Sequence, residues 1–348
     1  MKIAPVIEAL RAVSGIRQLL VNTGQHYDES MAGSFFKELA LPFPDRDLGV
    51  GSGSHAVQTA RIMIAFEEVC LAERPDLVVV VGDVNSTLAA SLVAAKLVIP
   101  LAHVEAGLRS FDRDMPEEVN RMVTDRLADL LFTPSRDADE NLRAEGTPEA
   151  RIHFVGNVMI DTLRRHLPMA GLERIRDRIP VEDRAYAVLT LHRPSNVDRP
   201  GTFADILKAV RAVGSKMPVV FPVHPRTRSR LHELHLDGEL DGTILTEPLG
   251  YIDFLSLTSH ARLILTDSGG LQEESTALGI PCLTLRENTE RPVTVTHGTN
   301  RVVGTRTADI VSGFEQALVA TWEGKIPELW DGHAADRVAR VIQERLLP

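Results

Sequence analysis

A run of five apolar residues, Leu77-Val78-Val79-Val80-Val81, limits the choice of fold for this chain. A strand with one face in water alternates apolar and polar residues, whereas this run is apolar at every position. Such a run is typical of a central strand in a parallel sheet that helices cover on both faces. The sequence therefore predicts an α/β protein.

Short β-branched segments alternate with longer amphipathic segments along almost the whole chain. We expect strands at 16–23, 77–82, 100–105, 130–134 and 152–156, and then at 185–191, 218–223, 243–246, 263–266, 281–285 and 301–304. This alternation indicates right-handed βαβ units in doubly wound sheets. Because the pattern repeats after about residue 160, we predict two Rossmann-like domains that face a cleft. They comprise residues 1–160 and 161–333, and a C-terminal helix at 334–348 packs back on the first domain.

Composition excludes several classes of protein. The 348 residues are enough for two hydrophobic cores, and a net charge of −10 argues against nucleic acid or an anionic membrane as partner. The two cysteines form no disulfide framework, no zinc-binding spacing occurs, and no apolar run approaches the roughly 20 residues of a membrane span. No signal peptide is recognisable, so we expect a cytoplasmic protein without a metal. A Walker A sequence is absent, and the glycines at 49–53 follow no predicted strand, so neither ATP hydrolysis nor NAD is indicated.

Polar residues follow nearly every predicted strand, at the edge where open parallel sheets bind ligands. Three carboxylates, Asp83, Glu105 and Glu117, follow strands of the first half, and carboxylates that face one cleft can divide acid and base work. Asp83 and Glu117 could instead belong to helix starts, where acidic residues are favoured. A structural role is harder to assign to Glu105, because it ends a buried strand and has no obvious capping role.

The segment Asp267-Ser268-Gly269-Gly270 joins a predicted strand to a helix. Two glycines allow close approach of a ligand, and the free N–H groups of the helix start suit a phosphate, with Glu274 within reach of ribose hydroxyls. The alternative is a tight turn capped by Ser268. His192 at another strand end and Arg291 in a loop could likewise be structural.

Together these segments resemble the non-hydrolysing UDP-N-acetylglucosamine 2-epimerases from residue 2 to the C-terminus. The matching motifs are Thr23-Gly24-Gln25-His26, Gly82-Asp83, His103-Val104-Glu105-Ala106-Gly107-Leu108-Arg109, Met115-Pro116-Glu117-Glu118-Val119-Asn120-Arg121, Thr190-Leu191-His192-Arg193, Pro222-Val223-His224-Pro225, Asp267-Ser268-Gly269-Gly270-Leu271-Gln272-Glu273-Glu274 and Glu290-Arg291-Pro292. The resemblance implies the glycosyltransferase-B architecture, a homodimer and no cofactor. It also implies inversion at C2 of the sugar by elimination of UDP to a 2-acetamidoglucal and re-addition of UDP.

The resemblance also implies a role for each matching residue. Catalysis would involve Lys2, Asp83, Glu105, Glu117 and His192, and UDP-sugar binding would involve Arg121, Leu249, Phe254, Ser268, Gly269, Gly270, Glu274 and Arg291. Many family members bind a second, activating substrate molecule, and the matching residues are Gln25, His26, Arg61 and His224. In the family a strand and a Gly-Thr-Arg-Pro-Glu-like loop precede the segment that matches Met1–Pro5, so we expect this chain to lack both.

Three alternative functions remain open at the level of the sequence. A glycosyltransferase of the same architecture would share the glycine turn but would need an acceptor site, and the carboxylates of the first half favour the epimerase. A catalytically inactive nucleotide-sugar-binding protein would bind UDP but would show no turnover of a UDP-sugar. An epimerase for UDP-2,3-diacetamido-2,3-dideoxyglucuronate or a related sugar would use the same motifs.

Overall fold

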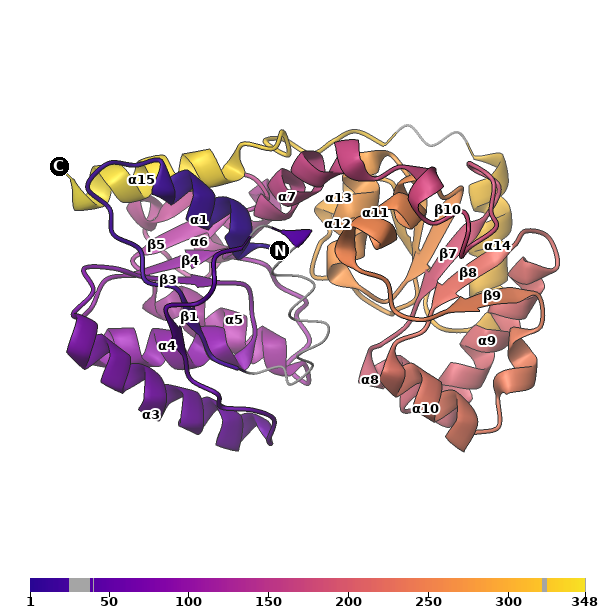
Figure 1. Cartoon of the computed structure of the whole chain (residues 1–348), viewed down its shortest axis with the longest axis horizontal. Coiled ribbons are helices and arrows are strands. Elements are labelled where there is room, and N and C mark those ends of the chain that lie inside the picture. Colours follow the sequence, from indigo (N-terminus) through magenta and orange to yellow (C-terminus); the bar gives the residue numbers. More distant parts are fainter. Residues whose placement is uncertain (25–37, 40, 321–323, 348) are drawn as a thin grey trace. The chain divides into compact units, whose positions relative to one another are not determined.

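A computed structural model describes residues 1–24, 38–39, 41–320 and 324–347. The chain divides into two compact units (Figure 1). The first comprises Met1–Thr162 and Glu328–Pro348, and the second comprises Leu163–Pro327.

The first unit is built on four parallel strands in the order β3-β4-β5-β6, namely β3 (Val78–Val81), β4 (Leu101–Val104), β5 (Leu130–Thr133) and β6 (Ile152–Phe154). Its helices are α1 (Ile3–Arg11), α3 (His55–Glu73), α4 (Asn85–Lys96), α5 (Pro116–Leu127), α6 (Arg136–Ala144) and α15 (Ala334–Leu346), and α7 (Val158–His166) leads into the second unit. Side chains of α1 and α15 pack on one face of this sheet, and side chains of α3 and α4 pack on the other. The apolar run at 77–81 is therefore covered on both faces, as predicted.

The C-terminal helix α15 is held by two contacts within the first unit. Asp161 accepts hydrogen bonds from the backbone N–H groups of Ala334 and Ala335, at 3.1 and 2.7 Å, and so caps the start of α15. Just before this helix, the buried Trp330 donates its indole N–H to the carbonyl oxygen of Pro134, 2.9 Å away.

The strand predicted at 16–23 is mostly wrong. Only β1 (Val21–Asn22) forms there, and it pairs in parallel with β2 (Arg46–Asp47) as a separate two-stranded sheet. The polar side chains before β1 bond elsewhere, because Arg17 pairs with Glu73 and Gln18 donates to the carbonyl of Ile7. The other ten predicted strands form, with bounds that differ by at most two residues at either end.

The second unit contains six parallel strands in the order β12-β11-β10-β7-β8-β9. They are β7 (Ala187–Thr190), β8 (Val219–Pro222), β9 (Thr243–Thr246), β10 (Leu263–Thr266), β11 (Cys282–Thr284) and β12 (Asn300–Val302). Its helices are α8 (Pro194–Val197), α9 (Pro200–Gly214), α10 (Pro225–Glu233), α11 (Tyr251–Ser259), α12 (Gly269–Leu278), α13 (Val293–Thr296) and α14 (Thr307–Val319). Short 3-10 helices span Leu167–Met169, Leu172–Arg174 and Asp237–Leu240 in this unit, and Glu149–Arg151 in the first unit. This order reverses between β7 and β10, which is the switch point where doubly wound sheets bind ligands.

The α/β prediction with parallel sheets is thus confirmed. Of the helices described, none is both long and apolar enough to cross a bilayer.

Candidate active site

In the first unit, Asp83 and Glu105 follow the paired strands β3 and β4. Glu105 has a left-handed backbone, with φ of 75°, which is uncommon for a residue with a side chain and typical of functional sites. The N–H groups of Glu105 and Ala106 both donate to the carbonyl oxygen of Phe132 in β5, each at 3.0 Å, and hold this turn in place. The carboxylate of Glu105 is buried and forms an ion pair with the Nζ atom of Lys2 from the start of α1.

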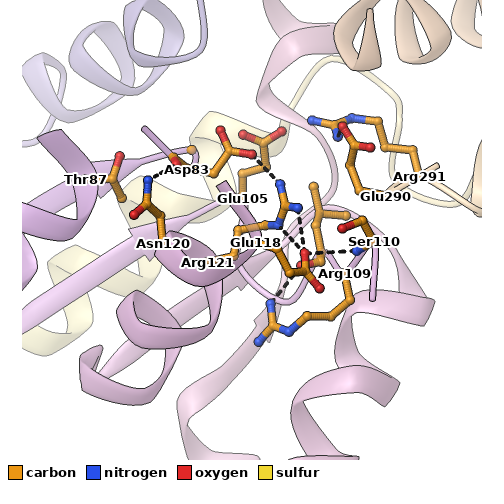
Figure 2. A network of polar contacts seen from close by, with 12 residues as sticks. Asp83, Thr87, Glu105, Arg109, Ser110, Glu118, Asn120, Arg121, Glu290 and Arg291 are labelled. Atoms are coloured by element: carbon orange, nitrogen blue, oxygen red, sulfur yellow. Dashed lines mark hydrogen bonds and ion pairs between the residues drawn. The ribbon is translucent and has the colours of Figure 1, made fainter. Parts of the chain in front are cut away.

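Arg121 of α5 links two carboxylates, as Figure 2 shows. Its Nη1 atom lies 2.5 Å from Oδ2 of Asp83 and its Nη2 atom 2.6 Å from Oε2 of Glu118. Glu118 also accepts the N–H groups of Ser110 and Phe111. Burial would raise the pKa of Glu118, but these hydrogen bonds and Arg121 hold it below its usual value. Arg121 itself is 1% exposed, so the contacts that it makes are with the protein.

The four residues Lys2, Asp83, Glu105 and Arg121 form what we call the carboxylate cluster. Asp83 is its more accessible carboxylate, with 22% of its side chain exposed against 5% for Glu105. Asn120 donates to the backbone carbonyl of Asp83 at 2.9 Å and so holds the loop after β3. The predicted Glu117 is half-buried at the start of α5, and it makes no hydrogen bond or ion pair with the residues that the structure describes.

At the switch point of the second unit, His192 follows β7 and Asp267 follows β10. The Nδ1 atom of His192 lies 2.8 Å from Oδ1 of Asp267, which is fully buried. Asp267 also accepts the backbone N–H groups of His192 and Arg193. Burial would raise the pKa of Asp267, but the His192 ring and these N–H groups hold it below its usual value. We did not predict a role for Asp267, although its position directly after a buried strand was a usable signal.

The segment after Asp267 leads into α12. Ser268 lies at the N-cap, but its side chain makes no capping hydrogen bond, so the alternative of a capping serine is wrong. Gly269 and Gly270 form the first turn of the helix, with their N–H groups unused by a side-chain cap. A Cβ atom on Gly269 would lie 2.8 Å from Oε1 of Glu290 and 3.0 Å from Nη1 of Arg291, so only glycine lets these groups approach.

An arginine cluster, consisting of Arg193, Arg286, Arg291, Glu290 and Glu273, adjoins this turn. Glu290 contacts Nη2 of Arg193 at 3.1 Å, Nη1 of Arg286 at 2.8 Å and Nη1 of Arg291 at 2.9 Å. Nε of Arg291 lies 2.9 Å from Oε1 of Glu273. Burial would raise the pKa of Glu290, but the three guanidinium groups outweigh it and hold the pKa far below its usual value. Three guanidinium groups and two carboxylates thus lie together beside the start of α12.

Glu274, one turn into α12, is buried and accepts a hydrogen bond from the hydroxyl of Tyr251, 3.1 Å away. Burial and the neighbouring Glu273 raise the pKa of Glu274 to about 7. The predicted uracil contacts, Leu249 and Phe254, are partly buried against the core that lies under α11 and α12.

The residues predicted to bind an activating molecule are less well defined. Gln25 and His26 lie outside the described residues. Arg61 is exposed on α3, and His224 caps α10 by accepting the N–H of Arg226. Within the described part of the chain, no group of three His, Cys, Asp or Glu residues is placed to hold a metal ion.

Comparison with known proteins identifies the family to which these features belong. Residues 8–343 match the family described as UDP-N-acetylglucosamine 2-epimerase. The chain belongs to this family. The UDP-N-acetylglucosamine 2-epimerase of Methanocaldococcus jannaschii is 43% identical, over 98% of this chain and 95% of that protein.

Two further comparisons extend this result. The crystal structure of the M. jannaschii UDP-GlcNAc 2-epimerase in complex with UDP-GlcNAc and UDP superposes with a TM-score of 0.92 at 42% identity, over 99% of this chain and 96% of that one. A Pseudomonas aeruginosa UDP-2,3-diacetamido-2,3-dideoxy-D-glucuronate 2-epimerase is 38% identical, over 98% of this chain and 95% of that protein. The predicted epimerase family and its two-domain fold are therefore confirmed, and this chain is an isomerase of that family.

Proposed function

We propose that this chain interconverts UDP-N-acetylglucosamine and UDP-N-acetylmannosamine, and that the residues of the carboxylate cluster act on the sugar. A base removes the proton from C2, the electron pair forms the C1–C2 double bond, and the C1–O bond breaks as UDP leaves. UDP then adds back to C1 of the 2-acetamidoglucal while C2 takes a proton on its opposite face. Each direction needs a group that accepts a proton and a group that donates one.

The observation that carries this proposal is the placement of Asp83 and Glu105 at adjacent strand ends, each beside its own cation. Arg121 holds the carboxylate of Asp83, and Lys2 holds the carboxylate of Glu105. A positioned pair of carboxylates supplies acid and base on a rigid frame. Glu117 stays a weaker candidate, because no contact in the described structure orients it.

The second unit supplies the residues that we propose for UDP. The N–H groups at Gly269 and Gly270 and the hydroxyl of Ser268 suit the diphosphate, because a helix start attracts anions and arginine side chains lie beside it. Arg291 and His192 would stabilise the charge of departing UDP. Glu274 would accept ribose hydroxyls, while Leu249 and Phe254 would contact uracil.

Proton NMR in heavy water without an added cofactor tests this function. Incubation with UDP-N-acetylglucosamine should yield UDP-N-acetylmannosamine with deuterium at C2. A product without deuterium would contradict proton abstraction at C2, and complete absence of product would contradict the proposed substrate.

A second substrate, UDP-2,3-diacetamido-2,3-dideoxy-D-glucuronate, is favoured by the similarity to the P. aeruginosa relative. The same assay with this sugar separates the two candidates. The sugar with the higher kcat/KM is the preferred substrate.

We also propose that two copies of the chain associate through α3. Three apolar residues on this helix, Val57, Ile64 and Leu71, are 44%, 65% and 60% exposed, and their spacing of seven places them on one face. Two α3 helices that cross antiparallel at Ile64 bring Val57 opposite Leu71 of the partner subunit. The same register brings Arg61, which makes no ion pair with a described residue, opposite Glu67 of the partner subunit. A two-fold dimer requires a patch that is complementary to itself, and this register pairs apolar with apolar residues and Arg61 with Glu67 of the partner subunit.

This assignment gives Arg61 a role at the dimer face in place of contact with an activating molecule. His224 stays a prediction for such a second site. Sigmoidal dependence of the rate on substrate that becomes hyperbolic in His224→Ala would support it, and hyperbolic kinetics of the unaltered protein would argue against it.

We propose a cytoplasmic location on the basis of Cys70 and Cys282. Both thiols are free and buried in separate units, which suits a reducing compartment.

A further inference from the structure

His103 of β4 is fully buried, and both of its ring nitrogens contact hydrogen-bond acceptors. Its Nε2 atom lies 2.8 Å from the carbonyl oxygen of Gly82 at the end of β3. Its Nδ1 atom lies 2.6 Å from Oδ1 of Asp125 in α5. A carbonyl oxygen can only accept a hydrogen bond, so Nε2 must carry a hydrogen.

The state of Asp125 decides whether Nδ1 carries a hydrogen as well. The other oxygen of Asp125 accepts the N–H of Gly107 at 3.0 Å and lies 2.7 Å from Nη1 of Arg109. Arg109 in turn makes two hydrogen bonds to Glu145, at 2.7 and 2.8 Å. Burial would raise the pKa of Asp125, but the His103 ring and Arg109 outweigh it and hold the pKa below its usual value. The contacts with Gly107 and with the guanidinium group of Arg109 are those of an ionised carboxylate, and an ionised Asp125 would require a hydrogen on Nδ1 as well.

The residues that contact His103 and Asp125 are close in sequence to Asp83 and Glu105. Gly82 directly precedes Asp83, His103 lies two residues before Glu105, and Gly107 lies two residues after it. Gly107 packs closely against the backbone of Ala138, since a Cβ atom at this position would lie 2.4 Å from the carbonyl oxygen of Ala138. The pair of His103 and Asp125 therefore ties β3, β4, the turn after β4 and α5 together at one point.

We propose that His103 is a positioning residue which, as an imidazolium ion, sets the placement of Asp83 relative to Glu105. A neutral ring could donate to Gly82 or to Asp125, but not to both, and one strand end would lose its anchor. This inference rests on the proposed epimerase reaction, in which proton transfer at C2 depends on how accurately the two carboxylates are held.

Kinetics of two variants test the positioning role. His103→Phe keeps an aromatic ring but removes both donors, and we expect kcat to fall on the order of a hundredfold while KM stays within about twofold. His103→Gln keeps one donor for the carbonyl of Gly82 and should recover part of this loss. His153→Gln is the matched control, because His153 lies on β6 of the same sheet and its Nε2 atom has no hydrogen-bond partner among the described residues, so its kcat should match the unaltered protein. A folded His103→Phe protein with unchanged kcat would overturn the proposal, as would a loss that appears only in KM.

Nitrogen-15 NMR of the histidine rings tests the charge without reference to activity. In the unaltered protein at pH 8, the signal that disappears in His103→Gln should show two protonated ring nitrogens. One protonated nitrogen would mean a neutral ring and would overturn the proposal even if the variants lose activity. If the unaltered protein epimerises neither sugar, the proposed function fails, and the NMR result still decides the state of His103.

Discussion

The exposed imidazole of His192 is oriented by the buried carboxylate of Asp267, 2.8 Å from its Nδ1 atom. A carboxylate at Nδ1 keeps that nitrogen protonated and turns Nε2 toward the side where the ring is exposed. The same relationship orients the histidine of catalytic triads. His192 is therefore held ready to donate to, or accept from, a group outside the protein.

Asp267→Asn should lower kcat about a hundredfold, because the amide no longer fixes the tautomer of His192. UDP affinity, measured by calorimetry, should change much less. Asp309→Asn is the matched control and should leave kcat unchanged, because Asp309 is a half-buried carboxylate on α14 that pairs with Arg306. An Asp267→Asn protein with the control's kcat would show that orientation of His192 is not needed.

Asp83→Asn and Glu105→Gln should each abolish turnover while UDP affinity is retained, because the proposed UDP contacts lie in the second unit. Loss of a positioned acid or base costs about 10² to 10⁴ in rate. Deuterium incorporation into UDP-N-acetylglucosamine at C2 distinguishes the two residues. Substitution of the residue that serves as base in the forward direction should stop this exchange entirely. Near-normal turnover of both variants would refute the assignment of the carboxylate cluster.

Gly269→Ala should weaken UDP binding about tenfold, because the added Cβ would displace Glu290 and Arg291 from the start of α12. The matched control is Gly201→Ala in the first turn of α9, where a Cβ atom meets nothing within 4 Å. Calorimetric titration with UDP measures both. Equal UDP affinities of the two variants would mean that UDP binding does not depend on the close approach of the arginine cluster to the start of α12.

Glu274→Gln should make the protein more stable above neutral pH. The pKa of about 7 lies above the value of 4.5 for an exposed glutamate, so the folded state binds this proton more tightly than the unfolded state does. The resulting stability is fully present below about pH 4.5 and is lost as the pH rises through 7. At pH 8 the variant should gain on the order of 1–3 kcal/mol in unfolding free energy, and the gain should shrink at pH 5.

Urea unfolding at the two pH values measures this difference, with Glu315→Gln at an exposed position of α14 as control. The same Glu274→Gln variant should bind UDP more weakly, since one ribose acceptor is lost. A gain in stability that is equal at pH 5 and pH 8 would rule out titration of Glu274 as its cause.

Ile64→Arg should convert a dimer to a monomer, because it brings two positive charges together at the centre of the proposed α3 contact. Light scattering coupled to gel filtration measures the mass. Val319→Arg, at a valine that is 85% exposed in the second unit, is the control and should stay dimeric. A monomeric unaltered protein, or a dimeric Ile64→Arg protein, would remove α3 as the interface.

Much of the fold and part of the site follow from local patterns in the sequence. Apolar runs such as 77–81 specify buried strands, and the residue after each run must lie at the carboxyl edge of a parallel sheet. For this reason Asp83, Glu105, His192 and Ser268 could be recognised as candidates from the sequence. The pattern failed at 16–23, where half of the residues are polar and the side chains of Arg17 and Gln18 have partners outside the segment.

The partners of these residues depend on tertiary structure. Strand order brings β7 beside β10 and so joins His192 to Asp267, 75 residues further along the chain. Packing of α5 under the strand ends turns Arg121 toward Asp83 and Glu118, although its sequence motif suggested a substrate contact. The same packing places Asp125 against the ring of His103. Periodicity in a sequence reports which side chains leave water, whereas pairing and charge state depend on which distant groups the folded chain brings within a few ångströms of each other.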